Sequence, residues 1–165
     1  MLTEWVANRN MKKLLNSISN LSIEDEFKMK LEQLKELFFP PFKQVKDCIL
    51  ISEKSVDKLE DTFDKAVEMH MDKTGYEASS TETQINCFFE NSISMEFGVK
   101  IALIVLEVWR LQLKNMEPQS KFCLIMSCDE EHVEIRFHKV RKNEKMWLNK
   151  DLEKYKDEAI GYVMI

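Results

Sequence analysis

The chain has 165 residues, of which 44% are apolar and 32% are charged, with only three glycines and three prolines. This length and composition fit one globular domain and leave no room for a low-complexity tract or a flexible linker. The first residues lack a basic segment followed by an apolar run, and the longest uninterrupted apolar run, Ile101 to Leu106, is too short to span a bilayer. We therefore expect a cytoplasmic protein with neither a secretion signal nor a membrane partner.

The net charge of -5 is concentrated in one short segment. Residues 52–72 contain three lysines and seven acidic residues, a balance of -4. The balance is +1 in residues 1–51, -2 in residues 73–120 and zero in residues 121–165. An acidic surface repels nucleic acid and attracts a basic partner, so we expect no nucleic-acid binding.

The N-terminal part is predicted to be helical. The spacing of its apolar residues predicts one helix over most of residues 2–18. A second helix, capped by Ser22 and with an acidic first turn, is expected to end at Pro40-Pro41, because proline cannot donate to the helix ladder. Residues 42–51 stay ambiguous, since Cys48 to Ile51 fits a short buried strand as well as the end of a helix.

The most regular helical pattern begins at Ser52 or Ser55 and is expected to end at Gly75. At about 100° per residue, its apolar residues gather on one side and four acidic residues gather on the other. Like charges at i,i+4 destabilise a helix by about 0.2–0.5 kcal/mol per pair, so local stability does not explain this arrangement. A solvated face, partly neutralised by Lys58 and Lys65, is the alternative interpretation. The acidic ridge consists of Asp57, Asp61, Asp64 and Glu68.

A long central helix is predicted after a loop and a short helix. The loop is expected within residues 76–83, and the short helix carries Ile85, Phe88 and Phe89. The long helix runs from Met95 to about Met116, with apolar residues on nearly every side, which is typical of a buried helix. We expect it to lie behind the C-terminal sheet.

Three apolar runs predict an antiparallel sheet at the C-terminus. Residues 122–127 and 133–140 form a hairpin, and residues 159–165 add a third strand. Apolar and charged side chains alternate along the second of these strands, which is typical of a half-exposed antiparallel strand. The hairpin turn is acidic and contains Asp129, Glu130 and Glu131.

The fold class is therefore α+β, with N-terminal and central helices packed on a small antiparallel β-sheet of three or more strands. We expect a single domain over residues 1–165, with the helical part at about 2–116 and the sheet part at about 121–165.

Two charged residues of the second strand suggest chemistry. Arg136 and His138, with Arg141 and the nearby Glu134 and Glu144, form a pattern that could hold a phosphate or act as a ribonuclease-like site. The alternative is an edge strand that alternating charges protect from pairing with another chain.

No metal site or cofactor site is predicted. Cys128 and His132 supply too few ligands for a closed zinc site, and three scattered glycines do not make a phosphate-binding loop. His70 lies on the apolar side of its helix, so we expect a core or boundary residue. The four cysteines lack a CxxC spacing, which favours reduced thiols over the alternative of a Cys123–Cys128 disulfide.

Several C-terminal motifs resemble those of small bacterial immunity proteins from polymorphic toxin systems, including contact-dependent growth inhibition. The resemblance implies a cytosolic, non-enzymatic inhibitor that binds a cognate toxin domain, commonly a nuclease, and blocks its active site or substrate surface. It carries over no catalytic residue. The motifs are residues 122–127, residues 136–141 with Glu144, Trp147-Leu148, residues 151–153 and residues 159–162.

Together these observations predict a partner-binding protein. Either the acidic ridge or the turn with Asp129, Glu130 and Glu131 is expected to meet a basic cleft, where acidic groups speed association and add specificity. Two alternatives remain: a small nuclease or phosphate-binding enzyme that uses Arg136 and His138, and a partner-binding regulatory domain.

Overall fold

The computed structural model describes residues 4–18 and 31–165. The predicted start of the second helix at Ser22 lies outside the described residues. The part of that helix within them is α2, Leu31–Phe38, which ends before the two prolines as expected.

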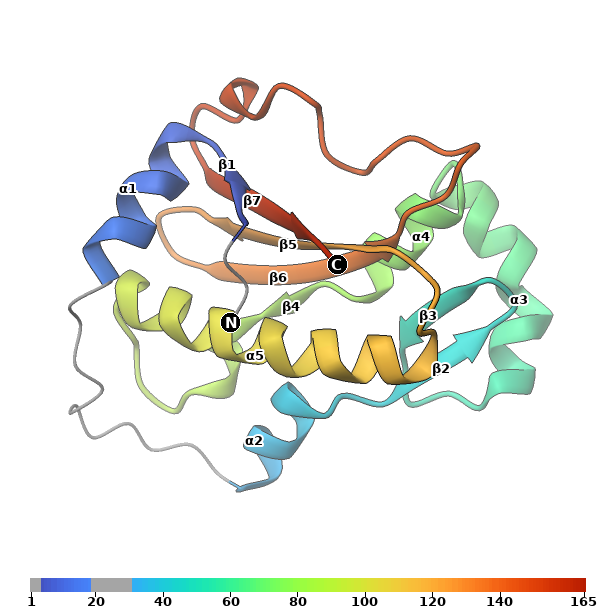
Figure 1. Ribbon diagram of the computed structural model, residues 1–165. Helices are drawn as coiled ribbons and strands as arrows, with labels where there is room; N and C mark the ends of the chain where they lie inside the picture. The colour runs from blue at the N-terminus through green and yellow to red at the C-terminus, as the bar shows by residue number, and fades with distance from the viewer. Residues whose placement is uncertain (1–3, 19–30) are drawn as a thin grey trace.

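A five-stranded antiparallel sheet forms the centre of the molecule (Figure 1). Its middle strand, β5, is buried along its whole length and pairs with β6 on one side and β7 on the other. This arrangement confirms the α+β class and the three predicted C-terminal strands. In spatial order the strands are β1 (Val6–Ala7), β7 (Ala159–Met164), β5 (Phe122–Cys128), β6 (Val133–Lys139) and β4 (Thr83–Gln84).

Helix α5, Met95–Met116, crosses one face of this sheet, as its apolar sequence predicts (Figure 1). Its Trp109 is fully buried and makes edge-to-face contacts with Phe42 and Phe137. The indole Nε1 of Trp109 donates a hydrogen bond of 3.0 Å to the carbonyl oxygen of Leu37, which attaches α2 to α5. The main core therefore lies between the sheet and its helices.

The opposite face of the sheet is covered by the segment after β6, residues 140–158, which folds back over it (Figure 1). Leu148 and Leu152 of this segment, the latter in the 3-10 helix η3 (Leu152–Lys154), pack on Cys123, Ile125 and Ile160. The prediction of a half-exposed second strand is therefore wrong, because this segment covers the face of β6 that we expected to be exposed: Trp147 stacks on Arg136, and its amide donates to His138.

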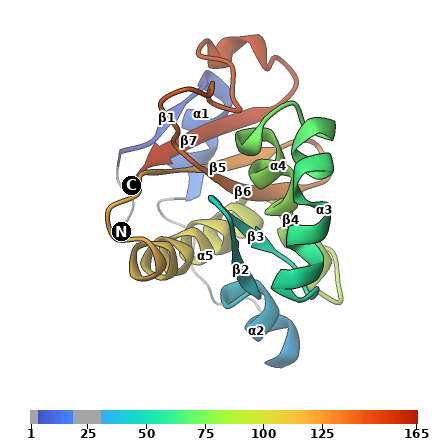
Figure 2. The ribbon, with the colours of Figure 1, turned by 90° about the vertical axis from the view of Figure 1, so that its right-hand side faces the viewer.

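A second, two-stranded sheet resolves the ambiguity of residues 42–51 in favour of strands. Its hairpin consists of β2, Phe42–Val45, and β3, Cys48–Ile51. It forms a separate small core with helix α3, Val56–Met69. Figure 2 shows α3 at the outer edge of the molecule, with α4 (Lys73–Ser80) between α3 and the main sheet.

The N-terminal helix is shorter than predicted, because Val6 and Ala7 pair with β7 instead. Asn8 then caps α1, Arg9–Ser17, by accepting a 2.9 Å hydrogen bond from the amide of Met11. The side-chain amide of Asn8 also donates to the carbonyl oxygen of Glu158, at 2.8 Å. This tertiary contact fixes where the helix begins.

The centre of the chain differs from prediction in two places. Gly75 does not end α3; it lies inside α4, which replaces the predicted loop. The predicted short helix is confirmed as the 3-10 helix η2, Ile85–Phe88, although the two-residue strand β4 precedes it. Strands β1 to β4 all lie in the part that we expected to be helical.

Candidate partner-binding surface

Helix α3 is anchored through its apolar side, as its sequence pattern predicts. Leu59 and Phe63 are buried against the β2–β3 hairpin, and Val67 packs beside them. The ring of Phe63 meets Tyr76 of α4 edge-on, with the ring centroids 5.7 Å apart. This packing fixes the rotation of α3 about its axis and directs the opposite side to solvent.

All four residues of the acidic ridge are exposed on that solvent side. Asp64, whose side chain is 89% exposed, pairs with the Nζ of Lys46 at 2.9 Å. Within residues 4–18 and 31–165, the other three ridge carboxylates have no hydrogen bond or ion pair, and Lys58 and Lys65 form no ion pair with them. The apolar side of α3 therefore fixes the position of the ridge, while three of its four carboxylates are unpaired within the described residues.

In the acidic hairpin turn, unlike in the ridge, one carboxylate is bound by the backbone of the turn itself. The carboxylate of Asp129 accepts hydrogen bonds from the amides of Glu131, at 2.8 Å, and His132, at 2.7 Å. These two bonds lower the pKa of Asp129 and shape the turn. Glu130 and Glu131 are exposed.

The two acidic surfaces lie at opposite ends of β6 (Figure 1). The turn precedes Val133 at one end, whereas Lys139 at the other end contacts Asp47 in the β2–β3 turn beside α3, at 3.0 Å. Seven strand residues span about 20 Å. The two candidate surfaces can therefore be tested separately by mutation.

Arg136 does not present a free guanidinium group. Its side chain is only 8% exposed and forms ion pairs with Glu82, at 2.7 Å, and Glu134, at 2.8 Å. The guanidinium also stacks on Trp147, 4.3 Å from the ring centroid. Two carboxylates already neutralise this arginine, so it offers little attraction to a phosphate.

His138 is 1% exposed, and both of its ring nitrogens lie against nearby backbone groups. Its Nδ1 lies 3.0 Å from the carbonyl oxygen of Lys139, and its Nε2 accepts a 3.5 Å hydrogen bond from the amide of Trp147. Burial lowers the pKa of His138, which favours the neutral ring. The geometry of Arg136 and His138 does not support a nuclease site.

The outer edge of β6 is covered rather than protected by exposed charges, so the edge-strand interpretation is wrong. Besides the short pairing with β4, three of its amides donate to side chains of other elements. Val133 donates to Asn86 at 2.8 Å, Phe137 donates to Thr81 at 3.1 Å, and Lys139 donates to Glu77 at 2.6 Å.

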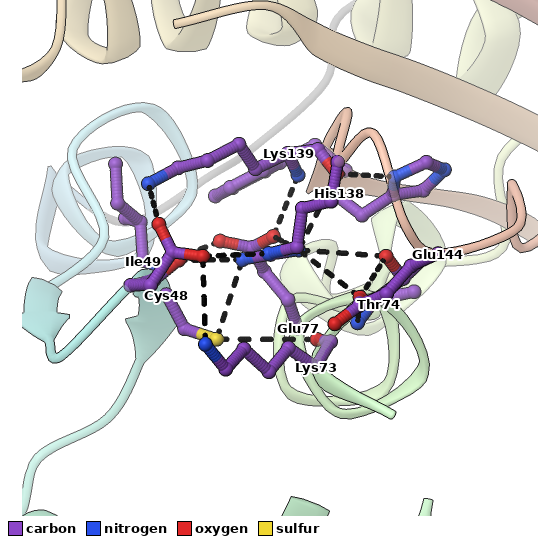
Figure 3. Close-up of polar contacts among 12 residues, drawn as sticks. Cys48, Ile49, Lys73, Thr74, Glu77, His138, Lys139 and Glu144 are labelled. Carbon is purple, nitrogen blue, oxygen red and sulfur yellow. Dashed lines mark hydrogen bonds and ion pairs between the residues drawn. The ribbon is translucent and has the colours of Figure 1, made fainter. Parts of the chain in front are cut away.

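A buried ionic cluster, which the sequence did not reveal, joins α4 to both sheets (Figure 3). At its centre is Glu77, a fully buried residue of α4. One carboxylate oxygen accepts from the amide of Ile49 in β3, at 2.7 Å. The other accepts from the amide of Lys139, at 2.6 Å, and from Nη1 of Arg141, at 2.9 Å. Burial raises the pKa of Glu77, although Arg141 and the backbone donors oppose that rise.

Asp47 and Glu117 extend the ionic cluster, at whose margin Lys73 pairs with Asp47 at 3.7 Å and Glu144 pairs with Arg141 at 4.0 Å. Nε of Arg141 donates to Asp47 at 3.0 Å, and the ammonium of Lys139 bridges Asp47 and Glu117 at 3.0 and 2.8 Å. Burial acts to raise the pKa of Asp47, but the hydrogen bonds from Lys139 and Arg141 outweigh it and lower that pKa. The guanidinium of Arg141 is thus paired with carboxylates of the chain itself. The cluster attaches α4 and the β2–β3 hairpin, on which α3 packs, to the main sheet.

The cysteines are free thiols. Burial raises the pKa of Cys48, Cys123 and Cys128 to about 12, so these three thiols are unreactive, whereas Cys87 is exposed. In the described part of the chain, no group of three or more potential ligands is placed to hold a metal ion.

Comparison with known proteins identifies one family. The Uncharacterized protein PM0498 family matches residues 6–165. Neither the curated proteins nor the solved structures contain a significant match to the chain. Among the helices of the described residues, none is long and apolar enough to cross a membrane.

Proposed function

We propose that this chain, which belongs to the Uncharacterized protein PM0498 family, binds a basic protein domain through the acidic ridge on α3 and inhibits it. In this proposal it acts in the cytoplasm, without catalysis, as an immunity protein of a polymorphic toxin or contact-dependent growth inhibition system. The partner is a toxin domain, with a nuclease as the class of toxin that an acidic inhibitor suits best.

The observation that carries the proposal is the unpaired state of the ridge. Asp57, Asp61 and Glu68 repel one another along one side of a helix, with no cation of the described chain bound to them. A basic surface would neutralise all three at once. The anchored apolar side of α3 keeps them aligned, so little ordering is needed on binding.

Electrostatics explains how such a surface would act. Enzymes that grip nucleic acid present positive clefts, and a row of carboxylates competes with phosphates for the same cleft. Complementary charge speeds encounter and rejects acidic partners. Covering the cleft excludes the substrate without any chemical step.

The test uses the protein encoded by the adjacent upstream gene as the probe. The chain is co-expressed and purified with the C-terminal domain of that protein, and binding and inhibition are measured. In the ridge variant, Asp61→Lys/Glu68→Lys, both changed residues are exposed and unpaired within the described chain. The matched turn variant, Glu130→Lys/Glu131→Lys, carries the same charge change at the other end of β6.

We expect wild type and the turn variant to bind and inhibit equally well, and the ridge variant to bind at least about tenfold more weakly. Weaker binding by the turn variant alone would assign the interface to the hairpin turn. A complex without inhibition would favour the partner-binding regulatory domain. Absence of a wild-type complex would refute the proposal.

A further inference from the structure

Two methionines directly follow the acidic ridge and are unusually exposed. Met69, the last residue of α3, is 75% exposed, and Met71 is 92% exposed. They are the two most exposed large apolar side chains of the described residues. Single exposed apolar residues are ordinary, but only His70 separates these two, and Met69 directly follows Glu68.

The turn that carries Met71 is fixed by hydrogen bonds on both sides, and the amide of Met71 itself donates to the carbonyl oxygen of Glu68 at 3.2 Å. The carboxylate of Asp72 caps α4 by accepting from the amide of Gly75, at 2.7 Å. Nδ1 of the half-buried His70 lies 2.8 Å from the carbonyl oxygen of Ala66, which confirms His70 as a boundary residue. A Cβ at position 75 would collide with the carbonyl oxygen of His70, so only glycine fits where α4 begins beside the end of α3.

Met71 occupies a backbone conformation that local stability does not favour for methionine. Its φ is 71°, in the left-handed region. Glycine or asparagine is the usual residue at this position after a helix, because a side chain with a Cβ is strained there. The exposed side chain of Met71 gains no burial in return. The strained backbone at Met71 is therefore not offset by burial of its side chain within the chain, which points to a contact of this side chain with another molecule.

We propose that Met69 and Met71 form an apolar anchor that enters an apolar pocket beside the basic cleft of the partner protein. This inference rests on the proposed function, because the ridge next to the anchor selects a basic partner. Methionine is flexible and polarisable, which suits an irregular pocket. Apolar contacts inside a ring of polar ones contribute most of the affinity at many interfaces. The hydrogen-bonded turn presents the anchor with little loss of backbone freedom.

The first test separates the anchor from the ridge by kinetics. The anchor variant, Met69→Gln/Met71→Gly, is mixed with the C-terminal domain of the adjacent upstream gene product. We expect dissociation to become at least about tenfold faster, with an unchanged association rate and unchanged salt dependence. Because glycine relieves the strain, the melting temperature should stay the same or rise. The control, Leu111→Gln, removes another exposed apolar side chain, on α5, and should change neither rate.

A second measurement uses the unmodified chain. Mild peroxide oxidises exposed methionines to sulfoxides, and we expect the partner domain to slow oxidation of Met69 and Met71. Equal oxidation with and without partner, or unchanged dissociation of the anchor variant, would overturn the anchor while leaving a ridge-dependent complex intact. A lower melting temperature for Met71→Gly would show that Met71 is structural. If wild type forms no complex, the proposed function and the anchor fail together.

Discussion

Replacement of Glu77 by alanine should strongly destabilise the protein. The substitution leaves the buried amides of Ile49 and Lys139 without an acceptor and removes one carboxylate from Arg141. Each unsatisfied buried group costs about 1–3 kcal/mol, and breaking a buried ion pair typically costs about 3–5 kcal/mol in total. Asp47 still pairs with Arg141, so we expect a loss of about 3–4 kcal/mol. That loss is a large part of the about 5–15 kcal/mol that stabilises a domain of this kind.

Urea unfolding near neutral pH, followed by tryptophan fluorescence, measures this loss. Glu60→Ala, on the exposed side of α3, serves as the control and should change the free energy of unfolding by less than about 0.5 kcal/mol. In a double-mutant cycle, the variant with both Glu77→Ala and Arg141→Met should lose less free energy of unfolding than the two single variants together. The reason is that neither member of the buried ion pair remains without its partner. A loss below about 1 kcal/mol for Glu77→Ala would refute the structural role of the cluster.

Two further predictions concern buried titratable groups. Burial lowers the native pKa of His138, so between that pKa and the unfolded value of about 6.5 the unfolded chain takes up a proton that the native chain does not, and stability is lost as pH falls. The free energy of unfolding of wild type and His138→Asn is measured with urea between about pH 5 and pH 7. The wild-type value should fall more steeply with falling pH, by up to about 1.4 kcal/mol per pH unit. Parallel pH curves for the two proteins would contradict the burial of His138. Titration with a thiol reagent should modify Cys87 alone in the native protein and all four cysteines after unfolding; rapid native labelling of a second thiol would contradict the buried positions of the other three.

The elements that could be predicted from the sequence have strong local patterns. Helix α5 has a long apolar pattern, and β5 and β7 are continuous apolar runs, so the core was identifiable. The acidic ridge was predicted correctly as an exposed face, because the apolar residues on the opposite side of α3 fix its orientation.

Long-range contacts account for what the sequence did not reveal. The alternation in β6 predicted an exposed face, but Trp147 of the segment 140–158 lies over Arg136 and His138. Helix α4 resembles a loop because its end is rich in serine and threonine, yet Thr81 donates to the carbonyl oxygen of Phe137 at 2.8 Å and so attaches α4 to β6. Glu77 and Arg141 are 64 residues apart, and no local period connects them.

The central claim, that the ridge binds a basic partner, is tested most directly by the salt dependence of association. Association rates with the C-terminal domain of the adjacent upstream gene product are measured from about 0.05 M to about 0.5 M salt, a range over which the screening length falls severalfold. We predict that the wild-type rate falls at least about tenfold and that Asp61→Lys/Glu68→Lys flattens this dependence, while Glu130→Lys/Glu131→Lys keeps the wild-type slope. Identical slopes for wild type and the ridge variant would contradict the claim.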